Sequence, residues 1–525
     1  MKRYLAFPLM LLAMVSCSKD GPSGPDAGNL PSDPGYTLSH DMIVLGEKLE
    51  NPYKTENVRR AYTSLYPTRS RDDISTTDLY VRFLPENTSE YEALEDMGLE
   101  LVDHPVDYAV IVDGDYYQDP SVGEDDITWQ YTVVPADFEF PDIRYEILDE
   151  CFIADSNITT RSGETIDWAA LEAEAYRITG NGDRLVPQTK ATKYKPSGRI
   201  TIIDEHADGG KPFGVAGVRV RCNTFVKIAT AYTDRDGYYQ MQKNFSAKVN
   251  YRLVFKNEKS FAIGFNLVIV PASTSALGKS SPQGLSVTVS KSSDSKLFNR
   301  CVVNNAAYDY ISRCTDDDMG IDPPPSDLRI WLFSGMTASS AVMVHHGAFV
   351  ESRLLSNFLG VFSAIIAFFA PDITIGTADS PDYRDLYSET CHELAHASHY
   401  AKVGNSYWNK YIMFILTSYL TSGGMTYGNG DEQDAGYCEV GEMWAYYLES
   451  MMYKERYGGQ VPSFGTSFWF RPQIFRYLDN RGISRSDIFE AIDNEAIDRD
   501  VLKEKLIAVC PGKETVIEQA FSRYN

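Results

Sequence analysis

Hydrophobic and polar residues alternate in short runs over residues 76–190, as they do in half-buried strands. We predict strands at 78–85, 99–102, 108–112 and 127–134. Helical periodicity is present instead at 41–49, 55–65, 89–97 and 167–178, the last with Thr165 as its cap. These elements predict an α+β domain over 76–190, preceded by a segment at 17–75 that includes the first two helical stretches.

A different pattern follows over residues 195–292. The segments GRITIID from Gly198, GVAGVRVR from Gly214 and TAYTDRDGYY from Thr230 predict strands, with an Asp-Gly turn in the third. The order G-x-I, G-V-x-V and T-D-x-D-G-x-Y resembles the carboxypeptidase regulatory-like domain. This resemblance implies an all-β, prealbumin-like sandwich over 195–292 that serves as an accessory module.

Long helical patterns separated by Gly-rich loops dominate residues 296–525, which we expect to form a mainly α domain with a small sheet. Residues 354–370 are nearly uncharged and predict a buried core helix rather than a membrane-embedded segment. Residues 371–376 are β-prone and predict a strand just before the helix described next.

The segment DLYSETCHELAHASHY, from Asp385 to Tyr400, contains the pattern HExxH on a predicted helix. His392 and His396 lie one turn apart on the same face, so their imidazoles can converge on one cation. Two His ligands and one further protein ligand leave a position on zinc for water, whose pKa the ion lowers toward neutrality. Glu393 is then placed to take the proton and deliver it to the leaving amine.

A third ligand has to come from another part of the chain. The metzincin pattern would place a His at position 402, which is Lys402. His399 lies on the same helix face as His392 but about 10.5 Å further along the axis, so a structural role suits it better. A carboxylate downstream is the remaining option.

The segment from Tyr437 to Glu449 predicts a second helix with two acidic candidates, Glu439 and Glu442. Its Glu442-x-x-Ala445 run, followed by a Tyr, resembles the ligand helix of gluzincin metallopeptidases. The resemblance implies that Glu442 is the third zinc ligand and that the small Ala445 lets the two helices approach. Glu439, one turn earlier, is the competing candidate.

The 45 residues from 397 to 441 exceed the shortest gluzincin spacings, and a predicted helix at 408–420 accounts for the insertion. In the same resemblance, the strand at 371–376 would be an edge strand that binds an extended peptide by β-addition. An ordinary edge strand fits this pattern equally well.

The N-terminus predicts export. A basic start and an apolar run at 5–15 match a signal peptide and are too short to span a membrane. The residues MVSC, ending at Cys17, resemble the lipobox of bacterial lipoproteins, which implies a signal peptide at 1–16 and a lipid on Cys17. An ordinary secretory signal is the alternative. The Gly-, Pro-, Ser- and Asp-rich residues 18–35 predict a flexible tether.

The chain has eight Cys, so seven remain if Cys17 carries lipid, and an odd number leaves at least one thiol without an intrachain partner. Cys301 with Cys314 and Cys391 with Cys438 are candidate disulfides. Free buried thiols fit the sequence as well.

The 525 residues carry a formal net charge of -24, which disfavours nucleic acid as a partner. Together, the patterns predict a multidomain zinc metallopeptidase, anchored to the cell envelope by lipid, that hydrolyses protein or peptide substrates. The alternative is a surface binding or adhesion lipoprotein with a structural zinc site. The sequence leaves the oligomeric state open.

Overall fold

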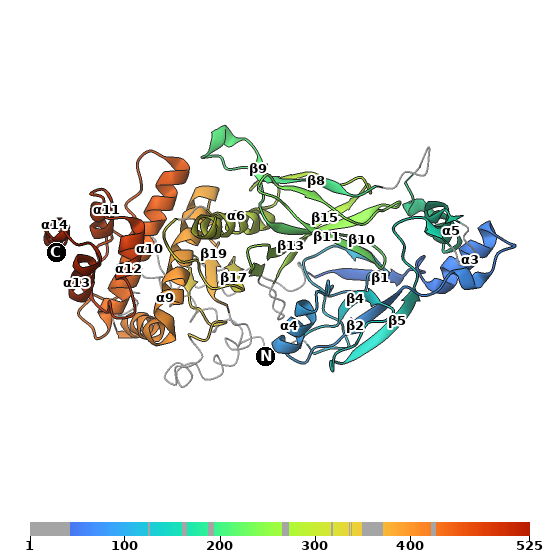
Figure 1. Ribbon diagram of the computed structural model, residues 1–525, viewed down its shortest axis with the longest axis horizontal. Helices are drawn as coiled ribbons and strands as arrows, with labels where there is room; N and C mark the ends of the chain where they lie inside the picture. Colours follow the sequence, from blue (N-terminus) through green and yellow to red (C-terminus); the bar gives the residue numbers. More distant parts are fainter. Residues whose placement is uncertain are drawn as a thin grey trace.

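The computed structural model describes residues 42–123, 126–159, 165–186, 194–264, 272–316, 319–334, 337, 339–348, 371–421 and 427–524. The predicted signal peptide, Cys17 and the tether lie outside these residues, as does the predicted helix at 354–370. No helix of the described residues has the length and apolar character needed to cross a bilayer. The architecture is mixed α+β and multidomain, with a sheet-rich region followed by a helical C-terminal region (Figure 1).

The N-terminal unit contains a three-stranded sheet, a two-stranded ribbon and three α-helices, together with the short strand pair β6 (Ile158–Thr159) and β7 (Thr165–Ile166). The sheet is antiparallel throughout, in the order β4 (Gln130–Pro135), β2 (Asp78–Phe83), β5 (Tyr145–Cys151). The ribbon pairs β1 (Val44–Lys48) with β3 (Tyr108–Val112). The helices are α3 (Thr55–Leu65), α4 (Thr88–Asp96) and α5 (Trp168–Ile178).

Several predictions for this unit are wrong in detail. Residues 41–49 contain strand β1 rather than a helix, because pairing with β3 overrides a local helical pattern. Residues 99–102 form no strand and contribute one bridge to Tyr131 of β4. Asp167, rather than Thr165, caps α5 by accepting a hydrogen bond from the backbone of its first turn.

Residues 195–292 contribute strands to two sheets. The smaller sheet has the order β12 (Tyr238–Gln240), β8 (Ser197–Ile202), β16 (Val287–Val289), with β9 (Phe213–Gly214) also paired to β8. The larger sheet begins with β11 (Lys227–Tyr232), β10 (Val218–Thr224), β13 (Val249–Asn257) and β14 (Phe261–Gly264), and β15 (Thr274–Ser280) pairs with β13. Most buried apolar residues of both sheets belong to one core.

The larger sheet continues into the C-terminal region. Strand β17 (Leu328–Phe333) runs parallel to β14, and β19 (Ile373–Gly376) runs parallel to β17. The short β18 (Ser340–Ala341) pairs antiparallel with β19. Strand β19 therefore lies between two partners, and the expectation that 371–376 is an edge strand is wrong.

Two long helices cross the C-terminal region. Helix α9 (Tyr383–Thr421) carries the HExxH motif, and α10 (Ala435–Tyr457) packs against it. The regular path of α9 breaks at Gly404, whose φ of 76° is accessible to glycine at little cost. The part of α9 after Gly404 contains the helix predicted at 408–420.

Among the residues that the structure describes, five further helices lie around this pair (Figure 1). They are α6 (Ser295–Thr315), α11 (Gln473–Asp479), α12 (Arg485–Ala491), α13 (Arg499–Val509) and α14 (Glu514–Arg523). Tyr310 of α6 lies with its hydroxyl 3.0 Å from that of Ser398 in α9, both buried. The motif helix is thus enclosed by helices and by the larger sheet.

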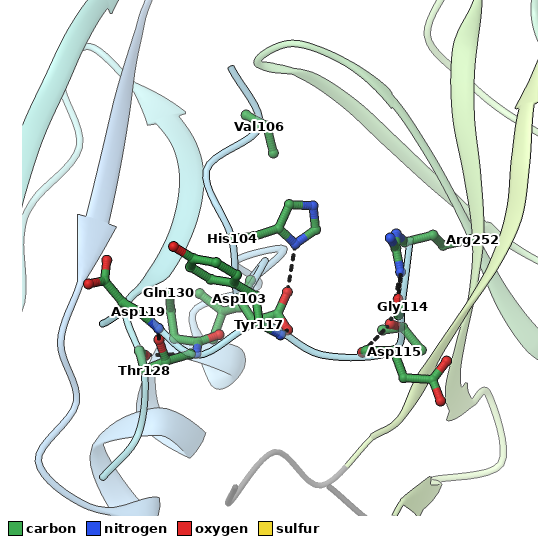
Figure 2. A network of polar contacts seen from close by, with 12 residues as sticks. Asp103, His104, Val106, Gly114, Asp115, Tyr117, Asp119, Thr128, Gln130 and Arg252 are labelled. Atoms are coloured by element: carbon green, nitrogen blue, oxygen red, sulfur yellow. Dashed lines mark hydrogen bonds and ion pairs between the residues drawn. The ribbon is translucent and has the colours of Figure 1, made fainter. Parts of the chain in front are cut away.

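A polar loop fixes the N-terminal unit to the larger sheet (Figure 2). Arg252 of β13 donates to the Asp113 carboxylate and, at 2.7 Å, to the carbonyl of Gly114. Arg300 of α6 lies 3.1 Å from the carboxylate of Asp115. Both guanidinium groups are buried, so these charge-assisted bonds hold the loop more firmly than exposed pairs would.

Candidate metal centre

Helices α9 and α10 position the candidate ligands, since both are free of proline and pack against each other. Asp382 caps α9 by accepting a hydrogen bond from the backbone of Asp385 at 2.9 Å. The Trp444 indole of α10 donates to the backbone carbonyl of Ala395 in α9 at 3.1 Å. The contact brings α10 directly over the motif turns of α9.

His392, His396 and Glu442 form a buried group that could bind a metal ion. The two Nε2 atoms lie 3.2 Å apart. Each lies 3.6 Å from one oxygen of the Glu442 carboxylate. Donor atoms held about 2.0–2.1 Å from one ion at tetrahedral angles are about 3.3–3.4 Å apart, so this spacing suits a small four-coordinate cation.

Tyr411 orients Glu442 from the part of α9 beyond Gly404. Its hydroxyl donates to Oε1 of Glu442 at 2.6 Å, and both side chains are buried. The insertion between His396 and Glu442 therefore supplies a partner for the candidate ligand. A buried carboxylate that accepts such a bond is held in one rotamer.

Glu449 is a residue of the centre that the sequence interpretation missed. Its Oε2 lies 3.2 Å from Nδ1 of His392, and its side chain is fully buried. A carboxylate at Nδ1 leaves Nε2 directed at the metal position and makes the imidazole a more basic ligand. The signal was present in the sequence, because Glu449 follows Glu442 by seven residues and thus lies on the same face of a helix.

Glu393 is buried beside the ligands, and neither of its carboxyl oxygens has a hydrogen-bond partner among the described residues. Burial, together with the neighbouring Glu442 carboxylate, raises the pKa of Glu393 well above its usual value. A buried polar group without a partner is costly. A water molecule on a metal ion would supply the missing donor, so the residues present fit such an ion.

The ionisable side chains of the centre alter one another's pKa values. Burial opposes a charge on His392, but hydrogen bonds to Glu442 and Glu449 outweigh it and raise the pKa of His392 to about 10. Burial lowers the pKa of His396. Burial also disfavours the Glu442 anion, yet the two imidazoles hold the pKa of Glu442 well below its usual range. The three side chains therefore favour a positive charge between them. A metal ion would supply that charge in place of the proton on His392.

The structure brings Glu442, and not Glu439, to the two imidazoles. Glu439 accepts a hydrogen bond from the Arg499 guanidinium of α13 at 2.6 Å. His399 faces away, with Nε2 3.1 Å from the carbonyl oxygen of Ile492, and burial lowers the pKa of His399 to about 3. These contacts give both side chains roles in helix packing.

The described cysteines form no disulfides with one another. Cys301 with Cys314 and Cys391 with Cys438, the two candidate pairs, are therefore free thiols. Burial raises the pKa of Cys391 and of Cys438 well above the usual value, so both are protonated at neutral pH.

Searches against models of protein families, curated proteins and solved structures find no match to this chain.

Proposed function

We propose that this chain is a zinc-dependent metallopeptidase of the gluzincin type. The observation that supports it most is the spacing of His392, His396 and Glu442, with the Glu393 carboxyl beside them, for which the described residues offer no hydrogen-bond partner. Two His and one Glu are a ligand set found in catalytic zinc sites, which keep one position for water.

Zinc held there would lower the pKa of a water molecule toward neutrality and polarise the scissile carbonyl. Glu393 takes the proton from the attacking water and returns it to the leaving amine. Burial raises the pKa of Glu393 in the metal-free centre, and a cation bound beside it would favour the carboxylate that accepts the proton. Glu449 keeps His392 in the tautomer that donates a lone pair from Nε2, and Tyr411 keeps the Glu442 carboxylate turned toward the imidazoles.

The proposed substrate is a protein or peptide. The mature chain would be exported and held to the cell envelope by a lipid on Cys17, with residues 18–35 as the spacer. The net charge of -24 argues against a nucleic-acid partner. The sandwich at 195–292 would be an accessory module that supports the peptidase region.

A structural metal site in a surface binding or adhesion protein is the second candidate, and one observation favours it. His392 is 3% exposed, and Glu393, His396 and Glu442 are 0% exposed. Structural zinc sites are closed, whereas catalytic ones keep an open position. A peptidase with this centre has to open before substrate reaches Glu393.

Glu393→Gln separates the two candidates. The peptidase proposal predicts that the variant binds zinc in the same stoichiometry as the wild type but cleaves a mixture of unstructured peptides at least about 1,000-fold more slowly, because no base remains at that position. Zinc is measured by elemental analysis and cleavage by mass spectrometry. Glu504→Gln, on the exposed face of α13, is the matched control and keeps full activity. Stoichiometric zinc with no cleavage by the wild type supports the structural alternative.

A further inference from the structure

A small cavity lies between the N-terminal unit and the larger sheet. Helix α4, the segment that follows it and β4 line the cavity from the N-terminal unit, and β10, β13 and β15 line it from the sheet. Its volume is about 40 Å³, which is room for roughly three water molecules. Polar and charged side chains make up most of its lining, so the cavity suits a hydrophilic occupant.

Three of the four carboxylates that line the cavity are each neutralised by a cation of the chain. The pairs are Glu95 with Lys256 at 3.1 Å, Glu100 with Arg219 at 2.9 Å and Asp115 with Arg300 at 3.1 Å. Little charge remains on these pairs for a ligand to neutralise. The fourth carboxylate, that of Asp103, has a different environment.

Asp103 is a carboxylate with no cationic partner. Its Oδ1 lies 2.7 Å from Nδ1 of His104, and its Oδ2 accepts from the backbone of Tyr117 at 2.7 Å (Figure 2). Burial lowers the pKa of His104, so the imidazole is neutral at pH 7. Burial opposes the Asp103 anion, but the two hydrogen bonds hold the pKa of Asp103 below its usual value. Among the described residues, no Lys or Arg lies within ion-pair distance of Asp103.

Arg221 of β10 carries the opposite charge at the cavity wall. Its side chain is buried, and Nη1 donates to the carbonyl of Leu101 at 3.2 Å. The nearest carboxylate oxygen of the described residues belongs to Glu100 and lies 3.7 Å from Nη1, beyond hydrogen-bond distance. A guanidinium has five N–H donors, so Arg221 has donors left for an anionic group in the cavity.

Tyr91 of α4 adds a hydroxyl to the lining. The residue is 3% exposed, and its ring packs with Tyr116 and Ile127. Burial and the nearby carboxylate of Glu95 raise the pKa of Tyr91 well above its usual value, so the hydroxyl keeps its proton. No atom of the described residues accepts a hydrogen bond from it. A buried donor without an acceptor is costly, which favours an acceptor inside the cavity.

From these contacts we infer that the cavity binds a small zwitterion, an α-amino acid of the size of glycine. Its carboxylate accepts from Arg221 and Tyr91, and its ammonium group donates to Asp103. Arg221 and Asp103 form no ion pair with each other, so one molecule that carries both charges provides each with a partner. Glycine takes about the volume of two to three water molecules, which matches the cavity. The inference is independent of the metal centre.

Calorimetric titration of the full-length chain with glycine, acetate and methylammonium tests this site. Acetate carries only the negative end of glycine, and methylammonium only the positive end. We expect glycine to bind with a dissociation constant below about 1 mM and each of the other two at least about tenfold more weakly, because one buried charge then stays without a partner. Acetate or methylammonium that binds as tightly as glycine overturns the zwitterion site. Absence of binding by all three means that the cavity holds water only and also overturns it.

Tyr91→Phe removes one donor and should raise the dissociation constant for glycine about tenfold. Tyr116→Phe is the matched control, because Tyr116 packs in the same cluster but its hydroxyl donates to Gln118, and it should leave the constant within about twofold. An unchanged constant in Tyr91→Phe, or an equal loss in both variants, overturns the site. Should Tyr91→Phe fold poorly, the comparison of the three probes on the wild type decides.

Glu442→Ala separates this site from the metal centre, because glycine can also bind a zinc ion. The variant removes a candidate metal ligand and leaves the cavity intact. We expect its dissociation constant for glycine to stay within about twofold of the wild type. Loss of glycine binding in this variant assigns glycine to the metal centre and overturns the cavity site. Retained binding in a chain that holds no zinc and cleaves no peptide supports the cavity site and contradicts the peptidase proposal alone.

Discussion

Oε2 of Glu449 lies 3.2 Å from Nδ1 of His392, and both groups are buried where α10 crosses α9. The pair couples the second helix to the first through a candidate ligand. In metal sites such a carboxylate fixes the orientation of the imidazole and raises its basicity. Glu449 should therefore affect metal affinity although it does not itself face the metal position.

Glu449→Gln is expected to weaken zinc binding by about 10- to 100-fold, because the neutral amide holds the imidazole less strongly. Competition with a chelator of known affinity measures the change. Glu504→Gln, which also removes one negative charge but lies on α13, should leave the affinity within about twofold. Equal loss in both variants would show that net charge alone, and not the contact with His392, sets the affinity.

Glu442 and Glu439 form a matched pair of variants one turn apart on α10. Glu442→Ala removes a ligand and should abolish stoichiometric zinc binding. Glu439→Gln weakens the contact with Arg499 but leaves the centre intact, so zinc content should remain that of the wild type. Elemental analysis of both purified variants is the measurement. Full zinc content in Glu442→Ala would mean that a different side chain is the third ligand.

Zinc binding should release protons. In the metal-free protein the pKa of His392 is raised to about 10, so its imidazolium is populated at neutral pH. A metal ion requires the neutral imidazole, and binding below that pKa therefore displaces at least one proton. The affinity should rise about tenfold for each pH unit through the neutral range. Calorimetry in buffers of different ionisation enthalpy counts the protons, and a heat that is independent of the buffer contradicts the expectation.

Lys227 and Glu172 provide a test of the contact between the N-terminal unit and the larger sheet. Lys227 Nζ of β11 lies 3.5 Å from Oε1 of Glu172 in α5, and both side chains are buried. Lys227→Met leaves the carboxylate without its cation and should lower the free energy of unfolding by about 3–5 kcal/mol. Urea denaturation measures it.

The double variant Lys227→Met with Glu172→Gln is the control for that measurement. It removes both charges and should recover part of the lost stability, since a neutral amide is cheaper to bury than an unpaired carboxylate. A loss below about 1 kcal/mol in the single variant would mean that solvent reaches this pair.

The residues of the candidate metal centre could be predicted from the sequence more readily than the sheet that supports them. The HExxH spacing places His392 and His396 on one helix face regardless of the rest of the fold. Glu442 could be predicted only through the resemblance of its helix, because no local rule relates it to a motif from which 45 intervening residues separate it. Its competitor Glu439 has the same residue type, and only the structure shows that Glu439 binds Arg499 of α13 whereas Glu442 faces the two imidazoles.

Strand positions were harder to predict because pairing is not local. The position of β19 inside the sheet depends on β18, a strand of two residues that carries almost no pattern of its own. Residues 41–49 carry a helical pattern but form β1 because β3, some 60 residues later, offers a partner. By contrast, α3 has the predicted bounds, because its apolar residues recur with helical periodicity and lie on the face of the helix that is buried.

The measurement that tests the account most directly is X-ray diffraction from crystals of the zinc-loaded protein on both sides of the zinc absorption edge. The account predicts one strong anomalous peak about 2.0–2.1 Å from Nε2 of His392, from Nε2 of His396 and from a carboxylate oxygen of Glu442, with Glu393 within reach of the remaining position. A peak elsewhere in the molecule, or none between these three side chains, would contradict it.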